Sequence, residues 1–338
     1  MDILIKSFNR PFYLDRCLTS IYRFVSGDFK IKILDDGTPK KYLEKIEEKY
    51  PEVEILMSKD YSQKSAAIAK NNTDGSNIDG FQIPVDLWIS AVRNASEYFL
   101  MMEDDVWFTK EVNLQKLMND CKNFDIHLLK LGWLGNTSDD QHLKVNSLTE
   151  NIDTLIPQKL FLSTEKVMEA FFYNHYKFYS ILYKLGKVDN RTREKYWALN
   201  SILMGLYKKE YWLEIWKGMN GRVDEKKQLI NSSIFYKKNR KNPNFISRLK
   251  NEAMKTTFQS SATNSYHEYG YDFDVNLFNH LINEAWLKGE FDVLQNFPND
   301  FSMAYFESFV SSKIDIEEFR KWVAHFKNQY HKLGADVN

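Results

Sequence analysis

Short apolar runs alternate with helical patterns over the first sixty residues. The runs at residues 3–5, 31–34 and 53–57 resemble buried strands, and apolar side chains recur at helical spacing over residues 14–25 and 42–50. Two strand–helix–strand units in succession require right-handed crossovers, which build a parallel sheet with helices on both faces. The alternation therefore predicts an α/β protein with a mixed, mostly parallel, Rossmann-like sheet.

The rest of the chain continues this pattern and then becomes mainly helical. A helix is expected over residues 84–95, a strand at residues 98–102, and one aromatic helix over residues 167–182. The 338 residues suffice for one large domain or two. We expect one α/β domain over residues 1–215 and a mainly helical region over residues 216–338.

Residues 59–80 are polar and lack periodicity, which predicts a long loop. A loop of this length in a compact domain is usually functional or disordered. Lys64 lies in it, and its ammonium group is a candidate contact for phosphate.

Polar clusters follow three of the predicted strands, at residues 7–10, 35–38 and 103–105. Ligands of open parallel sheets bind outside the carboxyl ends of the strands, so these clusters are consistent with one crevice. The sequence has neither the GxGxxG turn of dinucleotide enzymes nor the GxxxxGK[ST] loop. Phosphate would then be held by side chains and a metal.

Three consecutive acids, Glu103, Asp104 and Asp105, end an apolar run. Carboxylates at the end of a buried strand are costly unless they are paired, and three of them can hold a divalent cation. In the alternative interpretation they cap the next helix or lie in water.

The composition narrows the class of protein. Lys and Arg total 46 and Asp and Glu total 46, which argues against a nucleic-acid-binding protein. The chain has 24 Phe, 19 Tyr and 8 Trp, which suit either a core or stacking on sugars and bases. Cys17 and Cys121 fall on apolar helix faces, as small core residues in a reducing compartment do. The N-terminus does not resemble a signal peptide, and no apolar run could span a bilayer, so we expect a cytoplasmic protein.

Three motifs in order resemble family 2-type glycosyltransferases of the GT-A fold. Ser7-Phe8-Asn9-Arg10-Pro11 resembles the family's opening, Asp35-Asp36-Gly37-Thr38 its second-strand motif, and Glu103-Asp104-Asp105 its DXD motif, with Glu in the first place. The resemblance covers about the first 110 residues well. It is loose to about residue 215 and thin beyond. The resemblance implies a nucleotide-sugar-binding and catalytic domain over residues 1–215, with the mainly helical residues 216–338 completing the acceptor side.

The resemblance implies a nucleotide-sugar donor and a divalent metal, Mn2+ or Mg2+. By position, Asp35 or Asp36 would contact the base, Glu103 would lie near the ribose, and Asp105 would hold the metal against the diphosphate. A metal there stabilises the charge of the leaving diphosphate. The remaining donor-side candidates are Ser7, Asn9, Arg10, Lys64, Arg93 and Asp104.

An inverting transferase also needs a general base. Asp224 and Glu225 are candidates, and they could equally be acids at the start of a helix. His267 is a candidate late metal ligand. Trp133 is a candidate acceptor platform or an ordinary packed residue, and Arg93 could simply cap its helix.

Residues 222–255 are rich in Lys and Arg. This segment is either a solvated helix face or a surface for a diphosphate or an anionic membrane, with the protein peripheral at the inner membrane face.

We therefore expect a metal-dependent, hexosyltransferase-type enzyme of glycan biosynthesis. It would use a UDP-sugar or another nucleotide-sugar and a glycan, lipid-linked or other acceptor. The alternatives are a catalytically silent nucleotide- or sugar-binding protein on the same fold, and a sugar nucleotidyltransferase. The absence of a Gly- and Arg-rich first loop counts against the latter.

Overall fold

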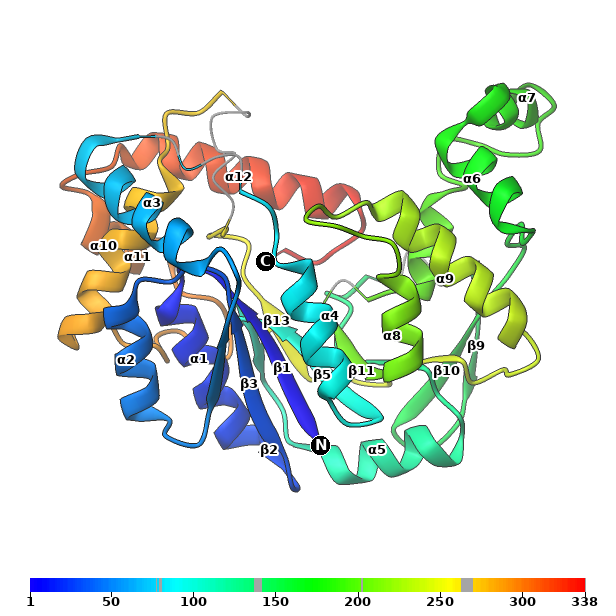
Figure 1. Ribbon diagram of the computed structural model, residues 1–338, viewed down its shortest axis with the longest axis horizontal. Helices are drawn as coiled ribbons and strands as arrows, with labels where there is room; N and C mark the ends of the chain where they lie inside the picture. Colours follow the sequence, from blue (N-terminus) through cyan, green and yellow to red (C-terminus); the bar gives the residue numbers. More distant parts are fainter. Residues whose placement is uncertain (77, 79–80, 137–141, 202, 263–269, 338) are drawn as a thin grey trace.

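A mixed β-sheet lies at the centre of the protein (Figure 1). The computed structural model describes residues 1–76, 78, 81–136, 142–201, 203–262 and 270–337, and within these ranges the sheet has nine strands in the order β4-β3-β1-β5-β11-β8-β12-β10-β9. Strands β4, β3, β1 and β5 run parallel, and β11 lies antiparallel between β5 and β8. The predicted mixed, mostly parallel sheet flanked by helices is confirmed. The strands are β1 (Asp2–Ser7), β3 (Lys30–Asp35), β4 (Glu54–Met57), β5 (Tyr98–Glu103), β8 (Leu128–Lys130), β9 (Leu143–Ser147), β10 (Ile152–Pro157), β11 (Gly205–Lys208) and β12 (Ile246–Leu249).

Two hydrophobic cores cover the two faces of the sheet. Side chains alternate along a strand, so Ile3 and Ile5 of β1 face one core and Leu4 faces the other. The first core includes residues of the helices α1 (Pro11–Phe24), α2 (Lys40–Lys49), α5 (Leu114–Asn123), α10 (Val275–Lys288), α11 (Met303–Val310) and α12 (Ile316–Lys332). The second includes residues of α4 (Val85–Asn94), α6 (Glu165–Tyr173), α8 (Lys209–Ile215) and α9 (Glu225–Asn239). Cys17 and Cys121 are buried and unbridged, as predicted.

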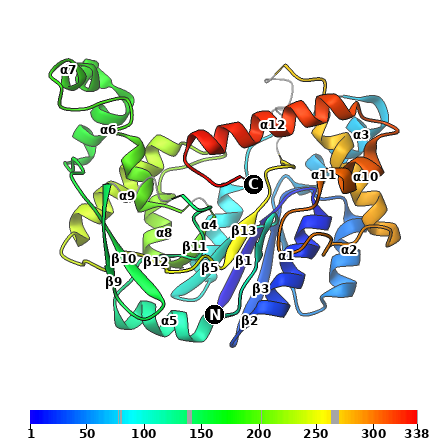
Figure 2. The same ribbon diagram turned by 180° about the vertical axis from the view of Figure 1, so that it is seen from behind.

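Two short ribbons and α12 complete the architecture. Strand β6 (Val106–Phe108) pairs with β13 (Met254–Thr256), and β2 (Val25–Ser26) pairs with β7 (Val112–Asn113). Helix α12 crosses above the carboxyl ends of β1 and β3 in both views (Figures 1 and 2). The C-terminal part of the chain therefore lies over the edge of the sheet where ligands of such folds bind.

The predicted loop over residues 59–80 is wrong, because Tyr61–Asp74 forms helix α3. Its buried residues are Lys64, Ile68 and Asn71, four and three residues apart and hence on one helix face. Two of these three are polar, so the face does not stand out as an apolar stripe. Each finds a partner: Lys64 bonds Asp36, and Asn71 Nδ2 donates to the Ser76 carbonyl at 2.9 Å.

The single aromatic helix predicted over residues 167–182 is also wrong. It breaks at Asn174, where φ is 57°, into α6 and α7 (Phe178–Lys184). Asn tolerates this left-handed conformation better than most residues. The Asn174 side chain then accepts a hydrogen bond from Ser180 N at 3.1 Å and donates one to Ser180 Oγ at 2.9 Å. Periodicity alone cannot show such a break.

Candidate functional site

The carboxyl ends of β1, β3 and β5 meet at one cavity of about 830 Å3. The strand register sets Ser7 beside Asp35 and Lys6 beside Glu103. The three polar clusters therefore lie together, as the sheet topology predicts. The cavity is lined by Lys6, Ser7, Phe8, Arg10, Asp36, Lys64, Ile68, Ile78, Phe81, Gln82, Ile83, Pro84, Trp88, Glu103, Asp104, Asp105, Glu225, Ser260, Ser261, Ala262, Phe326, Gln329 and Tyr330.

The turn after β1 is fixed by its neighbours. Asn9 has a left-handed φ of 53°, and its backbone N–H donates to Thr38 Oγ1 at 2.8 Å. Pro11 then begins α1, which suits the first position of a helix. Asn9 is 1% exposed and does not line the cavity, so it shapes the turn.

Arg10 joins this turn to the acids after β5. Its guanidinium nitrogens lie 2.5 Å from Asp104 Oδ1 and 2.9 Å from Asp105 Oδ2. Asp104 Oδ2 accepts a third bond, from Phe8 N at 3.1 Å. The planar, multi-donor guanidinium suits such a bridge between two carboxylates.

Burial and charge oppose each other in this pair. Burial lowers the pKa of Arg10, but Asp104, Asp105 and Glu103 raise it, and the net pKa lies above its ordinary value. Burial raises the pKa of Asp104 to about 7, although Arg10 acts in the opposite direction. Arg10 thus stays charged and stabilises carboxylates that burial alone would neutralise.

Lys6 makes a second ion pair, with Glu103 at 3.8 Å. Its ammonium also lies 4.2 Å from the ring centroid of Trp88, a cation–π distance. Burial lowers the pKa of Lys6, and Glu103 partly offsets this effect. Burial likewise raises the pKa of Glu103, which Lys6 counteracts.

The two acids after β3 differ in access. Asp35 is fully buried and accepts hydrogen bonds from Gly37 N, Thr38 N and Thr38 Oγ1 at 3.0, 2.8 and 2.6 Å. Burial raises the pKa of Asp35 to about 6. Asp36 lines the cavity and pairs with Lys64 Nζ at 2.5 Å. Asp36 therefore faces the cavity, whereas Asp35 holds the loop together.

The residues fit a divalent cation in part. Asp105 Oδ2 is bound by Arg10, whereas the buried Oδ1 has no hydrogen-bond partner among the residues described and is free to accept one. No group of three His, Cys, Asp or Glu side chains within the described ranges could hold a metal ion. His267, the other predicted ligand, lies outside those ranges.

Other predicted residues lie apart from the cavity, with one exception. Asp224 is the N-cap of α9; it accepts from Lys227 N at 3.0 Å and from Tyr173 OH at 2.5 Å. Its neighbour Glu225 does line the cavity. Arg93 is exposed in the last turn of α4, away from the cavity. Trp133 packs against the first core, with the Arg248 guanidinium 4.9 Å from its ring centroid.

Sequence reasoning missed several residues that line the cavity, among them Lys6, Trp88, Phe326, Gln329 and Tyr330. One signal was available: Lys6 is a charged residue between the apolar run at residues 3–5 and the polar cluster at residues 7–10. The aromatic residues of α12 gave no signal, because their helical spacing is also that of a core face.

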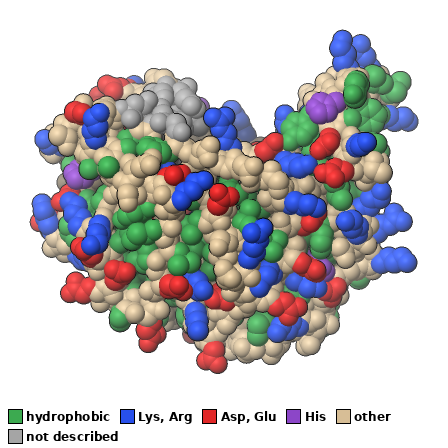
Figure 3. Space-filling model, in the orientation of Figure 1, with side chains coloured by type: hydrophobic (Ala, Val, Ile, Leu, Met, Phe, Trp, Pro, Cys, Tyr) green, Lys and Arg blue, Asp and Glu red, His purple; other side chains and the backbone are tan. Residues whose placement is uncertain are grey.

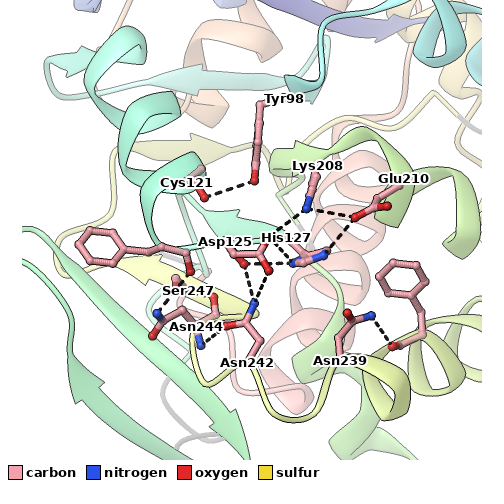
Figure 4. Close-up of polar contacts among 12 residues, drawn as sticks. Tyr98, Cys121, Asp125, His127, Lys208, Glu210, Asn239, Asn242, Asn244 and Ser247 are labelled. Carbon is pink, nitrogen blue, oxygen red and sulfur yellow. Dashed lines mark hydrogen bonds and ion pairs between the residues drawn. The ribbon is translucent and has the colours of Figure 1, made fainter.

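A second polar cluster lies away from the cavity, where β8 begins (Figure 4). His127 is buried and stacks on Phe245, with ring centroids 4.4 Å apart. Its Nε2 lies 3.3 Å from Glu210, and Lys208 bonds both Asp125 and Glu210. Burial and the nearby Lys208 lower the pKa of His127, so the ring is neutral at pH 7. None of these residues lines the cavity, which marks the cluster as structural.

No helix in the described part of the chain is both long and apolar enough to cross a membrane.

No protein-family model and no curated protein matches the chain. Among solved structures it is similar to TarS from S. aureus, with 11% identity and a TM-score of 0.43 over 97% of this chain and 48% of that chain. The match thus spans about half the length of TarS.

Two further solved structures are similar over nearly the whole chain. A shorter TarS chain in complex with UDP-GlcNAc shows 12% identity and a TM-score of 0.43 over 96% of this chain and 80% of that one. The mannosyltransferase PcManGT from Pyrobaculum calidifontis, in complex with GDP-Man and Mn2+, shows 10% identity and a TM-score of 0.36. This match covers 99% of this chain and 75% of that chain. These likenesses extend over nearly the whole of this chain, and the resemblance to the GT-A fold rests on the sequence motifs. TM-scores below 0.5 assign no donor, acceptor or metal, so function is argued from the site.

Proposed function

We propose that the protein is a glycosyltransferase that moves a sugar from a nucleotide-sugar, with UDP as the nucleotide, to a glycan or lipid-linked acceptor. One observation carries the proposal: the three matched motifs converge on one cavity of about 830 Å3 at the carboxyl ends of β1, β3 and β5. This volume lies within the range of small-molecule sites, roughly 300–1,000 Å3. The cavity holds both acids for hydroxyl groups and cations for phosphate.

The donor would lie between the turn after β1 and helix α3. Asp36 can accept hydrogen bonds from a base or ribose, and Glu103 from ribose hydroxyls. Lys64 is buried beside them, with its ammonium bonded to Asp36 and to the Gln82 carbonyl at 2.6 Å. Trp88 offers an aromatic surface, and its buried indole N–H has no acceptor among the residues described. These groups can orient a nucleotide and receive its diphosphate.

The divalent metal remains part of the proposal. Asp105 Oδ1 would hold it, with His267 as the second candidate ligand. A bound Mn2+ or Mg2+ acts as a Lewis acid on the diphosphate oxygens. Arg10 holds the other oxygen of Asp105, which fixes the direction of the carboxylate.

Glu225 is the better of the two base candidates. Tyr173 OH and two backbone N–H groups stabilise the charged form of Asp224, and although burial acts in the other direction, the pKa of Asp224 falls below its ordinary value. A carboxylate stabilised in this way is a weak base. Glu225 reaches the cavity instead.

The acceptor would enter beneath α12. Phe326 and Tyr330 line the cavity from this helix, and aromatic rings stack on sugar faces. These contacts support the proposed role of residues 216–338 on the acceptor side. A protein with this role would act in the cytoplasm, at or near the inner membrane face.

The deciding measurement is release of UDP from a panel of UDP-sugars in Mn2+, with calorimetry of UDP binding alongside. We expect turnover, and Glu225→Gln should lower it at least ~100-fold while donor affinity is retained. The matched control is Glu165→Gln, an exposed acid in the first turn of α6. UDP binding without any turnover would instead indicate the catalytically silent binding protein. Absence of UDP binding would refute the proposal.

A further inference from the structure

We propose that residues 174–188, here called the α7 lobe, dock the protein on an anionic lipid surface. The lobe projects from the body beside α6 (Figure 1). Both apolar and basic side chains gather on it (Figure 3). This inference does not depend on the donor chemistry proposed above.

Large apolar side chains are concentrated on the lobe. The described residues include eleven exposed large hydrophobics, and four of them fall within ten residues of sequence. Tyr176 is 95% exposed and Leu185 is 63% exposed. The other two are Ile181 and Tyr183, at 51% and 50%. Exposed apolar side chains that are scattered singly over a surface are ordinary, whereas a concentration of them at one projecting point indicates an interaction site.

The lobe is built to keep these side chains outward. Tyr179 turns inward, where its hydroxyl donates to the Asp189 carbonyl at 2.6 Å and the Arg193 guanidinium lies 3.6 Å from its ring centroid. Tyr176 and Lys177 have left-handed φ values of 55° and 57°, which cost free energy for residues with bulky side chains. The strained turn therefore presents Tyr176 to solvent at a cost that an ordinary surface loop would avoid.

The charge of the lobe specifies the partner. Residues 174–188 contain Lys177, Lys184 and Lys187 and no Asp or Glu, although the whole chain has a formal net charge of +0. All three lysines are exposed. A neutral protein with a local basic and aromatic tip has the composition that binds anionic headgroups, with Tyr at the interface and Lys facing phosphate. An acid-poor tip of this kind suits a lipid surface better than a mixed-charge protein surface.

The position of the lobe fits a membrane-linked acceptor. Helix α6 packs on α9, whose first residue Glu225 lines the cavity. Both views show α7 and α12 on the same side of the sheet, toward the carboxyl ends of its central strands (Figures 1 and 2). A bilayer that contacts the lobe would thus lie on the side where the cavity is.

The test is co-sedimentation of the full chain with vesicles of phosphatidylcholine and phosphatidylglycerol, and with phosphatidylcholine alone. We expect binding to the anionic vesicles, weakened by added salt. Replacing Lys177, Lys184 and Lys187 by Gln should reduce binding by about 100-fold at low salt, at roughly fivefold per lysine. The pair Tyr176→Ser and Leu185→Ser should also reduce it, with Tm unchanged because both side chains are exposed.

Matched controls lie elsewhere on the surface. Replacing Lys238, Arg240 and Lys241 by Gln removes the same charge from the basic segment 222–255, and Leu333→Ser removes an exposed apolar side chain from another site. Both should leave vesicle binding unchanged. Loss of binding only in the Lys238, Arg240 and Lys241 variant would overturn the proposal, as would no vesicle binding at all. A third result would also overturn it: the wild-type protein is a dimer in analytical ultracentrifugation, the lobe variants are monomers, and vesicles bind the wild-type protein and the variants equally. None of these results bears on donor turnover, which is measured without lipid.

Discussion

Replacing Arg10 by Met tests whether one guanidinium organises the cavity. The substitution keeps much of the side chain's length and removes its charge. Arg10 and Asp104 have side-chain exposures of only 6% and 2%, and Arg10 contributes two of the short contacts in the cluster, at 2.5 and 2.9 Å. Its loss leaves Asp104 and Asp105 without a counter-charge.

The expected loss follows from the burial of the pair. Breaking a buried ion pair from one side costs about 3–5 kcal/mol, because the remaining charge is left unpaired. Two features favour the lower end of this energy range. The pKa of Asp104 is already about 7, so this carboxyl can become neutral near physiological pH. Asp105 is 14% exposed and keeps some contact with water. We expect a loss of about 3 kcal/mol in unfolding free energy, or a fall in Tm of about 6 °C at roughly 2 °C per kcal/mol.

Urea unfolding and thermal melts at pH 7 measure this effect. Arg93→Met is the matched control, since Arg93 is exposed and lies away from the cavity, and it should change little. Arg10→Lys should lose an intermediate amount, because an ammonium lacks the fork that reaches both carboxylates. Mn2+ should raise the Tm of Arg10→Met more than that of wild type, since both acids then lack a counter-charge. A loss below about 1 kcal/mol for Arg10→Met would refute the reasoning.

Substitutions at His127, Gly37 and Asp224 also have defined outcomes. His127 is neutral when folded, because burial lowers its pKa; stability should therefore fall as pH drops below about 6.5. His127→Gln should flatten the urea-derived stability profile between pH 5 and pH 7, roughly the range in which free His titrates, whereas the exposed His175→Gln should not. Gly37→Ala should lower the free energy of unfolding, measured in urea, by about 1–3 kcal/mol, and calorimetry should show weaker UDP binding. The reason is that Gly37 has a φ of +142° and the new Cβ would lie 2.7 Å from Lys64 Cβ. Asp224→Ala removes a helix cap and should lower the free energy of unfolding by about 1 kcal/mol, yet it should keep normal turnover. Asp224→Asn should retain the stability of the wild type. Slow turnover in both variants would contradict the choice of Glu225 as the base.

The sheet and its ligand-binding edge could be predicted because they follow from local patterns. Apolar runs such as residues 3–5 specify strands on their own, and the strand–helix alternation sets their order. The polar clusters then fall at the carboxyl ends of these strands, and this placement does not depend on which groups their side chains contact. This reasoning placed Asp36, Glu103 and Asp105 at one cavity without any knowledge of distances.

What could not be predicted depends on contacts distant in sequence. Helix α3 could not be predicted because Lys64 on its buried face is explained by Asp36, 28 residues earlier, and by the carbonyl of Gln82, 18 residues later. Arg10 was expected on the donor, but its nearest partners are acids 94 and 95 residues away. Phe326 and Tyr330 reach the cavity from α12, and their pattern is that of an ordinary amphipathic helix.

The pairing of charges explains how the cavity keeps ionised groups in place before a ligand arrives. Lys6 pairs with Glu103, Lys64 with Asp36, and Arg10 with Asp104 and Asp105. Each cation is nearly buried, so an unpaired one would carry a large desolvation cost. A diphosphate that enters must therefore exchange partners with these acids instead of meeting free cations. In the proposed donor complex, such an exchange would free Asp36 and Glu103 to accept hydrogen bonds from the nucleotide, while the lysines would bind its phosphates. Affinity for the nucleotide should therefore depend on the acids and the cations together, and removal of either member of a pair should weaken it.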